Sequence, residues 1–323
     1  MRLNSISTIR LSALTLAANI VVILQGAVVR ATGSGAGCGS HWPSCNGQVV
    51  PLGHGTEAFV EYSHRLLSLG VLILGAWLLS RAYRVRRDKP GLFAFAGAAF
   101  VFLIIEALLG ALTVVLGYTG DNVSTSRGLM VAVHLVNSLM LVGTLAGTVL
   151  YAREKPPSWP LGLGSQGTLA TVLSVGMLGM LVLMFSGGIA AMGNTMFPSD
   201  SLAEGLAADF DTSSHPLIRL RMLHPVIAIT VGIYLFISLG LAWLIKPVPQ
   251  ARSLARALLL VYLVQLAVGT LNFAMLAPML LQLLHLALAV TAFGLLSALA
   301  VTALGIPAAA TSREAGVSPL ENF

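Results

Sequence analysis

The sequence predicts an all-α, polytopic membrane protein with eight transmembrane helices, arranged as two pseudo-symmetric four-helix bundles in a parallel internal repeat. Of the 323 residues, 56% are hydrophobic and 9% are charged, and the mean hydropathy is +0.88. A water-soluble domain of this size could not carry so much apolar surface. Apolar segments of about 20 residues, long enough to cross a bilayer, fall near residues 11–30, 58–81, 92–117, 128–151, 168–190, 217–245, 254–275 and 279–304.

The distribution of charge predicts the orientation of these helices. Short cytoplasmic loops carry an excess of Lys and Arg. Most of the 18 basic residues fall at the N-terminus, in the loops after the second, fourth and sixth helices, and in the C-terminal tail. Segment 191–215, on the other side, is acidic and has no Lys or Arg. We therefore expect a multi-pass protein of the plasma membrane with cytoplasmic N- and C-termini. Because the positive charge reflects this bias, we expect no nucleic-acid binding.

Related motifs in the two halves of the chain indicate a duplication. A histidine occurs early in the second and sixth helices, and again in the fourth and eighth, while Glu106 and Gln265 each stand four residues before a glycine. These glycines, Gly110 and Gly269, suit close helix crossings in lipid. Each half has an even number of helices, so the copies share one orientation and the repeat is parallel. We expect an N-terminal bundle, a cytoplasmic linker, a C-terminal bundle and a flexible tail, at residues 1–153, 154–167, 168–305 and 306–323.

Four of the seven histidines lie about six residues into the even-numbered predicted helices, which all start on the outer face. A rise of 1.5 Å per residue places every imidazole roughly 9 Å below the outer boundary. Ionisable groups in lipid usually face a bundle interior, and two facing imidazoles can ligate both axial positions of a haem iron. A zinc site would instead need three or four ligands at one centre. We expect His64 to pair with His134 in the first half, and His224 with His285 in the second.

Arginines near these histidines are candidate ligands of the haem propionates. A haem with its propionates toward the nearest aqueous face presents two carboxylates, which guanidinium groups bind well. Arg65 directly follows the histidine of the second helix, and Arg219 and Arg221 precede that of the sixth. The alternative is that helix-end arginines reach out to the interface, and we favour that interpretation for Arg30 and Arg127.

Two glutamates fall within predicted helices. Glu61 precedes His64 by three residues, so the two side chains share a helix face. A carboxylate near a dehydrated centre can do acid and base chemistry, and we expect Glu61 to take part in catalysis. The alternative is a simple ion pair with Arg65. Glu106, near the middle of the third helix, is either protonated and hydrogen-bonded structurally or part of a proton route.

The two cysteines of the chain, Cys38 and Cys45, lie in the first outer loop, where the compartment is oxidising. A C-x6-C spacing in a glycine-rich loop can bring the two α carbons to bridging distance. We favour a disulfide, which could be a structural link or a redox-active pair. A metal site completed by His41 and His54 is disfavoured, because the paired C-x2-C spacing of zinc sites is absent.

Taken together, these residues resemble the haem A synthase family. The resemblance rests on the run GAVVRATGSGAGC from Gly26, the following WPSCNG, EYSHR, EALLGALTV from Glu106 and the four helical histidines, and it extends over all eight predicted helices. It implies oxidation of the C8 methyl group of haem O to a formyl group, by successive hydroxylations and a dehydration. The product would be haem A, and haem b would be the prosthetic group.

The resemblance also implies roles for individual residues. His64 and His134 would hold the substrate haem, Glu61 would take part in catalysis, and haem b would be ligated by His224 and His285. Cys38 and Cys45 match a first-loop pair that is usually a disulfide. Some relatives have a second cysteine pair in the loop after the fifth helix, which segment 191–215 lacks.

The expected partners are the haem O substrate, the haem O synthase (protohaem farnesyltransferase), an electron acceptor that the sequence does not identify, and the lipid membrane. Small-residue faces would also permit homo-oligomers. Two other functions fit the same pattern: a dihaem b-type electron carrier linked to quinol, and a transporter built on a parallel repeat.

Overall fold

The computed structural model describes residues 5–305 except 52, 54, 165 and 246–248. Its elements are all helical: α1 (Ser5–Ala31), the short 3-10 helix η1 (Ser34–Ala36), α2 (Gly55–Arg84), α3 (Pro90–Val115), α4 (Thr125–Ala152), α5 (Gly167–Met196), α6 (Leu202–Phe210), α7 (Pro216–Arg221), α8 (Leu223–Ile245), α9 (Pro249–Ala274) and α10 (Met279–Leu304). Within the described residues, eight helical segments are long and apolar enough to cross a membrane. The predicted all-α, eight-span class is confirmed. The predicted flexible tail, residues 306–323, lies outside the described residues.

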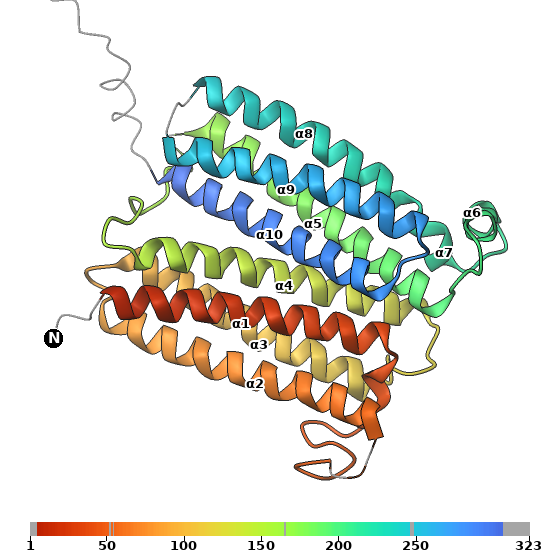
Figure 1. Ribbon diagram of the computed structural model, residues 1–323. Helices are drawn as coiled ribbons and strands as arrows, with labels where there is room; N and C mark the ends of the chain where they lie inside the picture. The colour runs from red at the N-terminus through yellow and green to blue at the C-terminus, as the bar shows by residue number, and fades with distance from the viewer. Residues whose placement is uncertain (1–4, 52, 54, 165, 246–248, 306–323) are drawn as a thin grey trace, which may run out of the picture.

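The long helices form two rings of four. In the first ring α1 packs on α2 and α4, and α3 packs on α2 and α4; in the second, α5 packs on α8 and α10, and α9 packs on α8 and α10. Helices α2 and α4 are therefore diagonal in one ring, and α8 and α10 in the other. Figure 1 shows the rings side by side, with α4 and α10 in the middle. The pseudo-symmetry of the halves stays a prediction.

Helices α4 and α10 are the most buried spans, because they face both rings. Leu139 and Val142 of α4 join a core cluster with α5, α8, α9 and α10, whereas Leu141 and Leu145 join a cluster with α1, α2 and α3. The helices approach closely at Gly143, where an added Cβ atom would lie 2.8 Å from Ser297 Oγ of α10. Small residues permit such crossings in lipid.

The sixth predicted span, 217–245, is interrupted near its start. A turn at Met222 separates α7 from α8. Pro225 explains the break: it has no N–H to donate to the carbonyl of Arg221, and its ring would clash with that carbonyl in a continuous helix. His215 begins α7 by accepting the N–H of Leu217 through Nδ1 at 3.3 Å. His224 therefore lies in the first turn of α8, directly after the break.

The two ends of the bundle differ. At the end beside the linker, the N–H groups of Ser158 and Gly162 donate to the carbonyls of Gly305 and Leu304 at 2.7 and 2.9 Å, which satisfies carbonyls at the C-terminus of α10. At the other end, which the charge pattern predicts to be outside, lie the cysteine loop and α6 (Figure 1). Sequence reasoning did not predict α6.

Candidate haem-binding site

The four helical histidines come from the diagonal helices of the two rings. His64 lies on α2 and His134 on α4, while His224 lies on α8 and His285 on α10. Each imidazole lies against a glycine of a neighbouring helix; these four ring-contact glycines are Gly26 of α1, Gly110 of α3, Gly187 of α5 and Gly269 of α9. Because diagonal helices face each other through the ring interior, each predicted pair has its two members on opposite sides of that interior.

The rings of His224 and His285 face each other in the second half. Their centroids are 6.2 Å apart and their planes are inclined at 82°. A metal-ligating imidazole nitrogen lies about 2 Å from its metal, which places the centroids of two axial rings across one iron about 6 Å apart. The observed separation fits a bis-histidine haem. The apolar helices around the rings suit a macrocycle.

Hydrogen-bond contacts in the second half favour the tautomer of His224 that can ligate a metal. Ser186 Oγ donates to the carbonyl of Leu183 at 2.7 Å, so its oxygen is able to accept Nδ1–H of His224 at 3.1 Å. A protonated Nδ1 leaves the lone pair on Nε2, the nitrogen that a metal would need. On the other side, Gln265 lies 3.2 Å from Nε2 of His285, and the buried Nδ1 of His285 has no hydrogen-bond partner within the described part of the chain.

In the first half, Glu106 contacts His134. One of its oxygens lies 3.4 Å from His134 Nε2, and the carboxylate also accepts hydrogen bonds from the side chains of Asn137 and Ser138. Glu106 therefore has the hydrogen-bonded, structural surroundings that we gave as one alternative, and its part in a proton route stays a prediction. Gln265 occupies the corresponding place beside His285, as the repeated sequence motif suggests.

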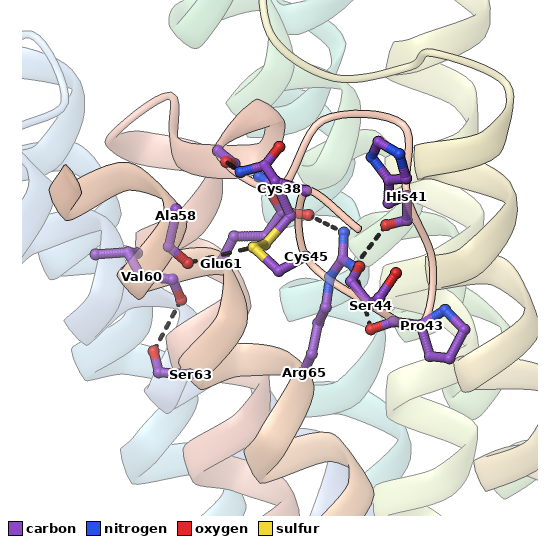
Figure 2. The surroundings of a disulfide bond; sticks show 12 residues. Cys38, His41, Pro43, Ser44, Cys45, Ala58, Val60, Glu61, Ser63 and Arg65 are labelled. Carbon is purple, nitrogen blue, oxygen red and sulfur yellow. Dashed lines mark hydrogen bonds and ion pairs between the residues drawn. A yellow bond between two sulfur atoms is a disulfide. The ribbon is translucent and has the colours of Figure 1, made fainter. Parts of the chain in front are cut away.

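Glu61 and Arg65 connect α2 to the cysteine loop (Figure 2). Glu61 is buried, with 4% exposure. It forms an ion pair with Arg65 and accepts the N–H of Cys38 at 2.8 Å. The ion pair that we gave as an alternative to catalysis is present, and the catalytic role stays a prediction. The carboxylate is fixed at the base of the loop, one helical turn before His64.

Arg65, on α2, binds the cysteine loop through hydrogen bonds to its carbonyl groups. Its Nη1 donates to the carbonyls of His41 and Ser44 at 2.8 and 2.7 Å, and lies 3.5 Å from that of Pro43. The predicted disulfide between Cys38 and Cys45 is present. The loop, the disulfide and the Glu61 carboxylate are thus connected to one another at the end of the first ring where α2 begins.

The other arginines have partners that the sequence did not indicate. Arg221 Nε lies 2.5 Å from Asp209 Oδ1, and its remaining nitrogens donate to Asn194 Oδ1 and the Gly205 carbonyl at 3.0 Å each, so this side chain ties α6 to α5 and α7. Arg219 is exposed and lies 3.5 Å from the Thr212 carbonyl. A propionate would have to share or displace the acceptors of Arg65 and Arg221. Their role in propionate binding stays a prediction.

Arg30 joins the two rings instead of reaching out to the interface. Its Nη1 donates to Thr195 Oγ1 of α5 at 2.5 Å, and its Nη2 to Gln282 Oε1 of α10 at 2.7 Å. Arg127 is buried and donates to the carbonyls of Gly120 and Asn122, in the loop before its own helix, at 2.6 and 2.8 Å. For Arg30 the interfacial interpretation does not describe the structure, because its guanidinium group donates to side chains of α5 and α10. For Arg127 that interpretation stays a prediction, because its acceptors lie in the loop between α3 and α4.

The ring-contact glycines are the residues that sequence reasoning interpreted differently. We expected Gly110 and Gly269 to mark helix crossings, yet an added Cβ atom on either would meet a histidine ring, at 3.8 and 2.7 Å from Cε1. A signal was available: each lies four residues after Glu106 or Gln265, the residues that contact the same two rings.

Fold and site define a polytopic helical membrane protein with two four-helix rings, each of which carries a histidine on both of its diagonal helices. Comparison with known proteins specifies the family: residues 9–297 match the sequence profile described as cytochrome oxidase assembly protein. The chain belongs to this family, which includes the haem A synthases.

Among individual relatives, two are named haem A synthase and one carries another name. The chain is 42% identical over 275 residues to a Thermus thermophilus protein named protoheme IX farnesyltransferase, a match that covers 84% of this chain and 44% of that protein. It is 34% identical over 160 residues to the haem A synthase of Halalkalibacterium halodurans, covering 48% and 50%. Over 102 residues it is 42% identical to the haem A synthase of Alkalihalophilus pseudofirmus, covering 30% and 33%. The chain thus spans less than half of the Thermus relative.

Proposed function

We propose that the protein is a haem A synthase, which oxidises the C8 methyl group of haem O to a formyl group. The observation that carries the proposal is the family match over residues 9–297. The facing rings of His224 and His285 support it, since their separation suits a bis-histidine haem. Relatives named haem A synthase give the reaction its most specific support.

In this proposal each half holds one haem. His224 and His285 would ligate haem b in residues 168–305, with Arg219 and Arg221 near its propionates, and His64 and His134 would hold haem O in residues 1–153, with Arg65 nearby. When bound, the haems supply the iron redox chemistry that oxidises the methyl group and moves the electrons. The protein supplies orientation through its imidazoles and an apolar interior that excludes water.

Glu61 is the residue proposed to handle protons. It lies on the same helix face as His64 and is buried, and the Cys38 N–H and Arg65 fix the direction of its carboxylate. An oriented, dehydrated carboxylate can accept a proton at one oxygen and return it. Its ion pair with Arg65, through Oε1, keeps the carboxylate in place between turnovers.

The proposal extends to partners and location. The protein's expected partner is a protohaem farnesyltransferase, because that reaction would supply haem O; the Thermus protein that carries this name is a relative of this chain. We place the protein in the plasma membrane with both termini in the cytoplasm, passing electrons to an acceptor, with homo-oligomers permitted by its small-residue faces.

Extraction of pigments after co-expression with a haem O source tests the proposal. We expect haem A to accumulate with the wild type, and to fall about a hundredfold or more in Glu61→Gln, the usual scale for a lost acid or base. Glu57→Gln, an exposed change on the same helix, is the matched control and should leave haem A unchanged. Bound but unaltered haem O in the wild type would favour the dihaem electron carrier, and a protein without haem would favour the transporter.

A further inference from the structure

The four imidazoles differ in their distance from the neighbouring helix backbone. A Cβ atom added to each ring-contact glycine would lie 2.7 Å from Cε1 of His285 at Gly269, 3.0 Å from that of His224 at Gly187, 3.1 Å from that of His64 at Gly26, and 3.8 Å from that of His134 at Gly110. Carbon atoms in van der Waals contact are about 3.5–4.0 Å apart. A methyl group at Gly269 would therefore force the imidazole of His285 to move, and at Gly187 and Gly26 the imidazole would have to shift by a few tenths of an ångström. At Gly110 a methyl group would make an ordinary van der Waals contact with His134.

Glycine at these helical positions needs a reason, because glycine is the poorest helix former after proline. Alanine would be preferred by the helix itself. The short distances supply the reason: without a Cβ, the backbone of one helix lets the imidazole of the next approach until the ring and the helix touch. This reason applies to the glycines of α1, α5 and α9, and it does not apply to Gly110 of α3, where a Cβ atom would lie 3.8 Å from the ring of His134.

The His285 ring has little freedom to give way. It lies between α9, which contributes Gly269 and Gln265, and the ring of His224, whose centroid is 6.2 Å away. Gln265 also lies 3.2 Å from Nε2. A methyl group on Gly269 would push the ring toward His224 or rotate Nε2 away from it. Either movement would disturb the separation that suits one iron between the two rings.

We propose that the ring-contact glycines are positioning residues for the haem ligands, and that their unequal clearance distinguishes fixed ligands from a yielding one. His224, His285 and His64 are held tightly against helix backbones. His134 has room on the side of Gly110 and its side chain is 30% exposed, and its contact with Glu106, at 3.4 Å from Nε2, is one that a ligand could displace. The second half, with two tightly held ligands, then retains its haem, whereas the first half has one ligand that moves when the substrate haem enters and the product leaves.

This inference rests on the proposed haem ligation, and Gly→Ala variants of the full-length protein test it. In purified Gly269→Ala and Gly187→Ala we expect about a tenfold lower haem b content, or a change of the remaining haem from low-spin to high-spin, as overpacking displaces a ligand. For haem O titrated into the protein, we expect Gly26→Ala to weaken binding about tenfold and Gly110→Ala by less than about threefold. Gly70→Ala is the control on α2, because its Cβ would meet no atom of the described residues within 4 Å.

Folding can be separated from positioning. Since alanine strengthens helices, loss of haem without loss of thermal stability of the haem-free protein would identify displacement of the ring. If Gly269→Ala unfolds the protein, removing the ring in Gly269→Ala/His285→Ala should restore the stability of His285→Ala alone.

Two results would overturn the inference while leaving the proposed function intact: wild-type haem content and spin state in Gly269→Ala, or equal loss of haem O binding in Gly110→Ala and Gly26→Ala. A wild-type protein that binds no low-spin haem would instead overturn the proposed function, and this inference with it.

Discussion

Removal of the Arg65 side chain should loosen the cysteine loop and leave Glu61 poorly compensated. Arg65→Ala deletes the ion pair with Glu61 and the hydrogen bonds to the carbonyls of His41 and Ser44. Breaking a buried ion pair by removing one partner costs about 3–5 kcal/mol. The Arg65 side chain is 13% exposed, and the Cys38 N–H still serves the carboxylate. We therefore expect a smaller loss of unfolding free energy, about 2–3 kcal/mol.

Denaturant unfolding of the haem-free protein in lipid nanodiscs measures this loss, and hydrogen exchange at Cys38–Gln48 locates it. Arg65→Lys should recover part of the stability, because an ammonium can pair with Glu61 but cannot reach the loop carbonyls in the same fork geometry. Arg219→Ala, an exposed arginine at the same end, is the control and should change stability by less than about 0.5 kcal/mol.

The double variant Glu61→Ala/Arg65→Ala decides whether the ion pair carries the effect. Removing both partners leaves no uncompensated buried carboxylate, so the double variant should be less destabilised than the sum of the single ones, by about 1–2 kcal/mol. If the stability loss of the double variant equals the sum of the two single losses to within about 0.3 kcal/mol, the coupling of Glu61 and Arg65 is refuted.

Three further predictions concern stability of the haem-free protein under the same assay. Cys38→Ser should cost about 2 kcal/mol by opening the short disulfide loop, and reduction of wild-type Cys38–Cys45 should reproduce that loss; an unchanged stability in both cases would contradict it. Arg30→Ala should cost about 1–3 kcal/mol by breaking the hydrogen bonds that join the rings, with hydrogen exchange rising at their seam; unaltered exchange there would count against the joining role. Gly143→Leu should cost about 1–3 kcal/mol, because its side chain would meet Ser297 where α4 crosses α10; wild-type stability would show that the crossing has spare room.

The helical class could be predicted from the sequence because it depends on local properties. Apolar segments of bilayer length and the scarcity of charge define the spans residue by residue, and all eight appear in the described structure. The disulfide could also be predicted from the sequence, since the two cysteines lie in one short loop. Even the ion pair of Glu61 and Arg65 follows from a spacing of four residues on a helix.

The remaining features depend on contacts between distant segments. Arg30 meets Thr195 and Gln282, which are far away in the chain, and no local pattern distinguishes such an arginine from one that reaches the interface. The break at Met222 had a local signal in Pro225, but the apolar character of the whole segment concealed it. The ring-contact glycines required knowledge of which helix faces which histidine.

The ligation of one iron by His224 and His285 is tested most directly by electron paramagnetic resonance of the oxidised protein, purified from cells that have no source of haem O so that the first half holds no substrate haem. The observed ring separation predicts a low-spin bis-histidine signal in the wild type, lost in His224→Ala and in His285→Ala separately, and kept in His41→Ala, a loop histidine. A low-spin signal that persists in either helical variant would contradict the pairing of these two rings.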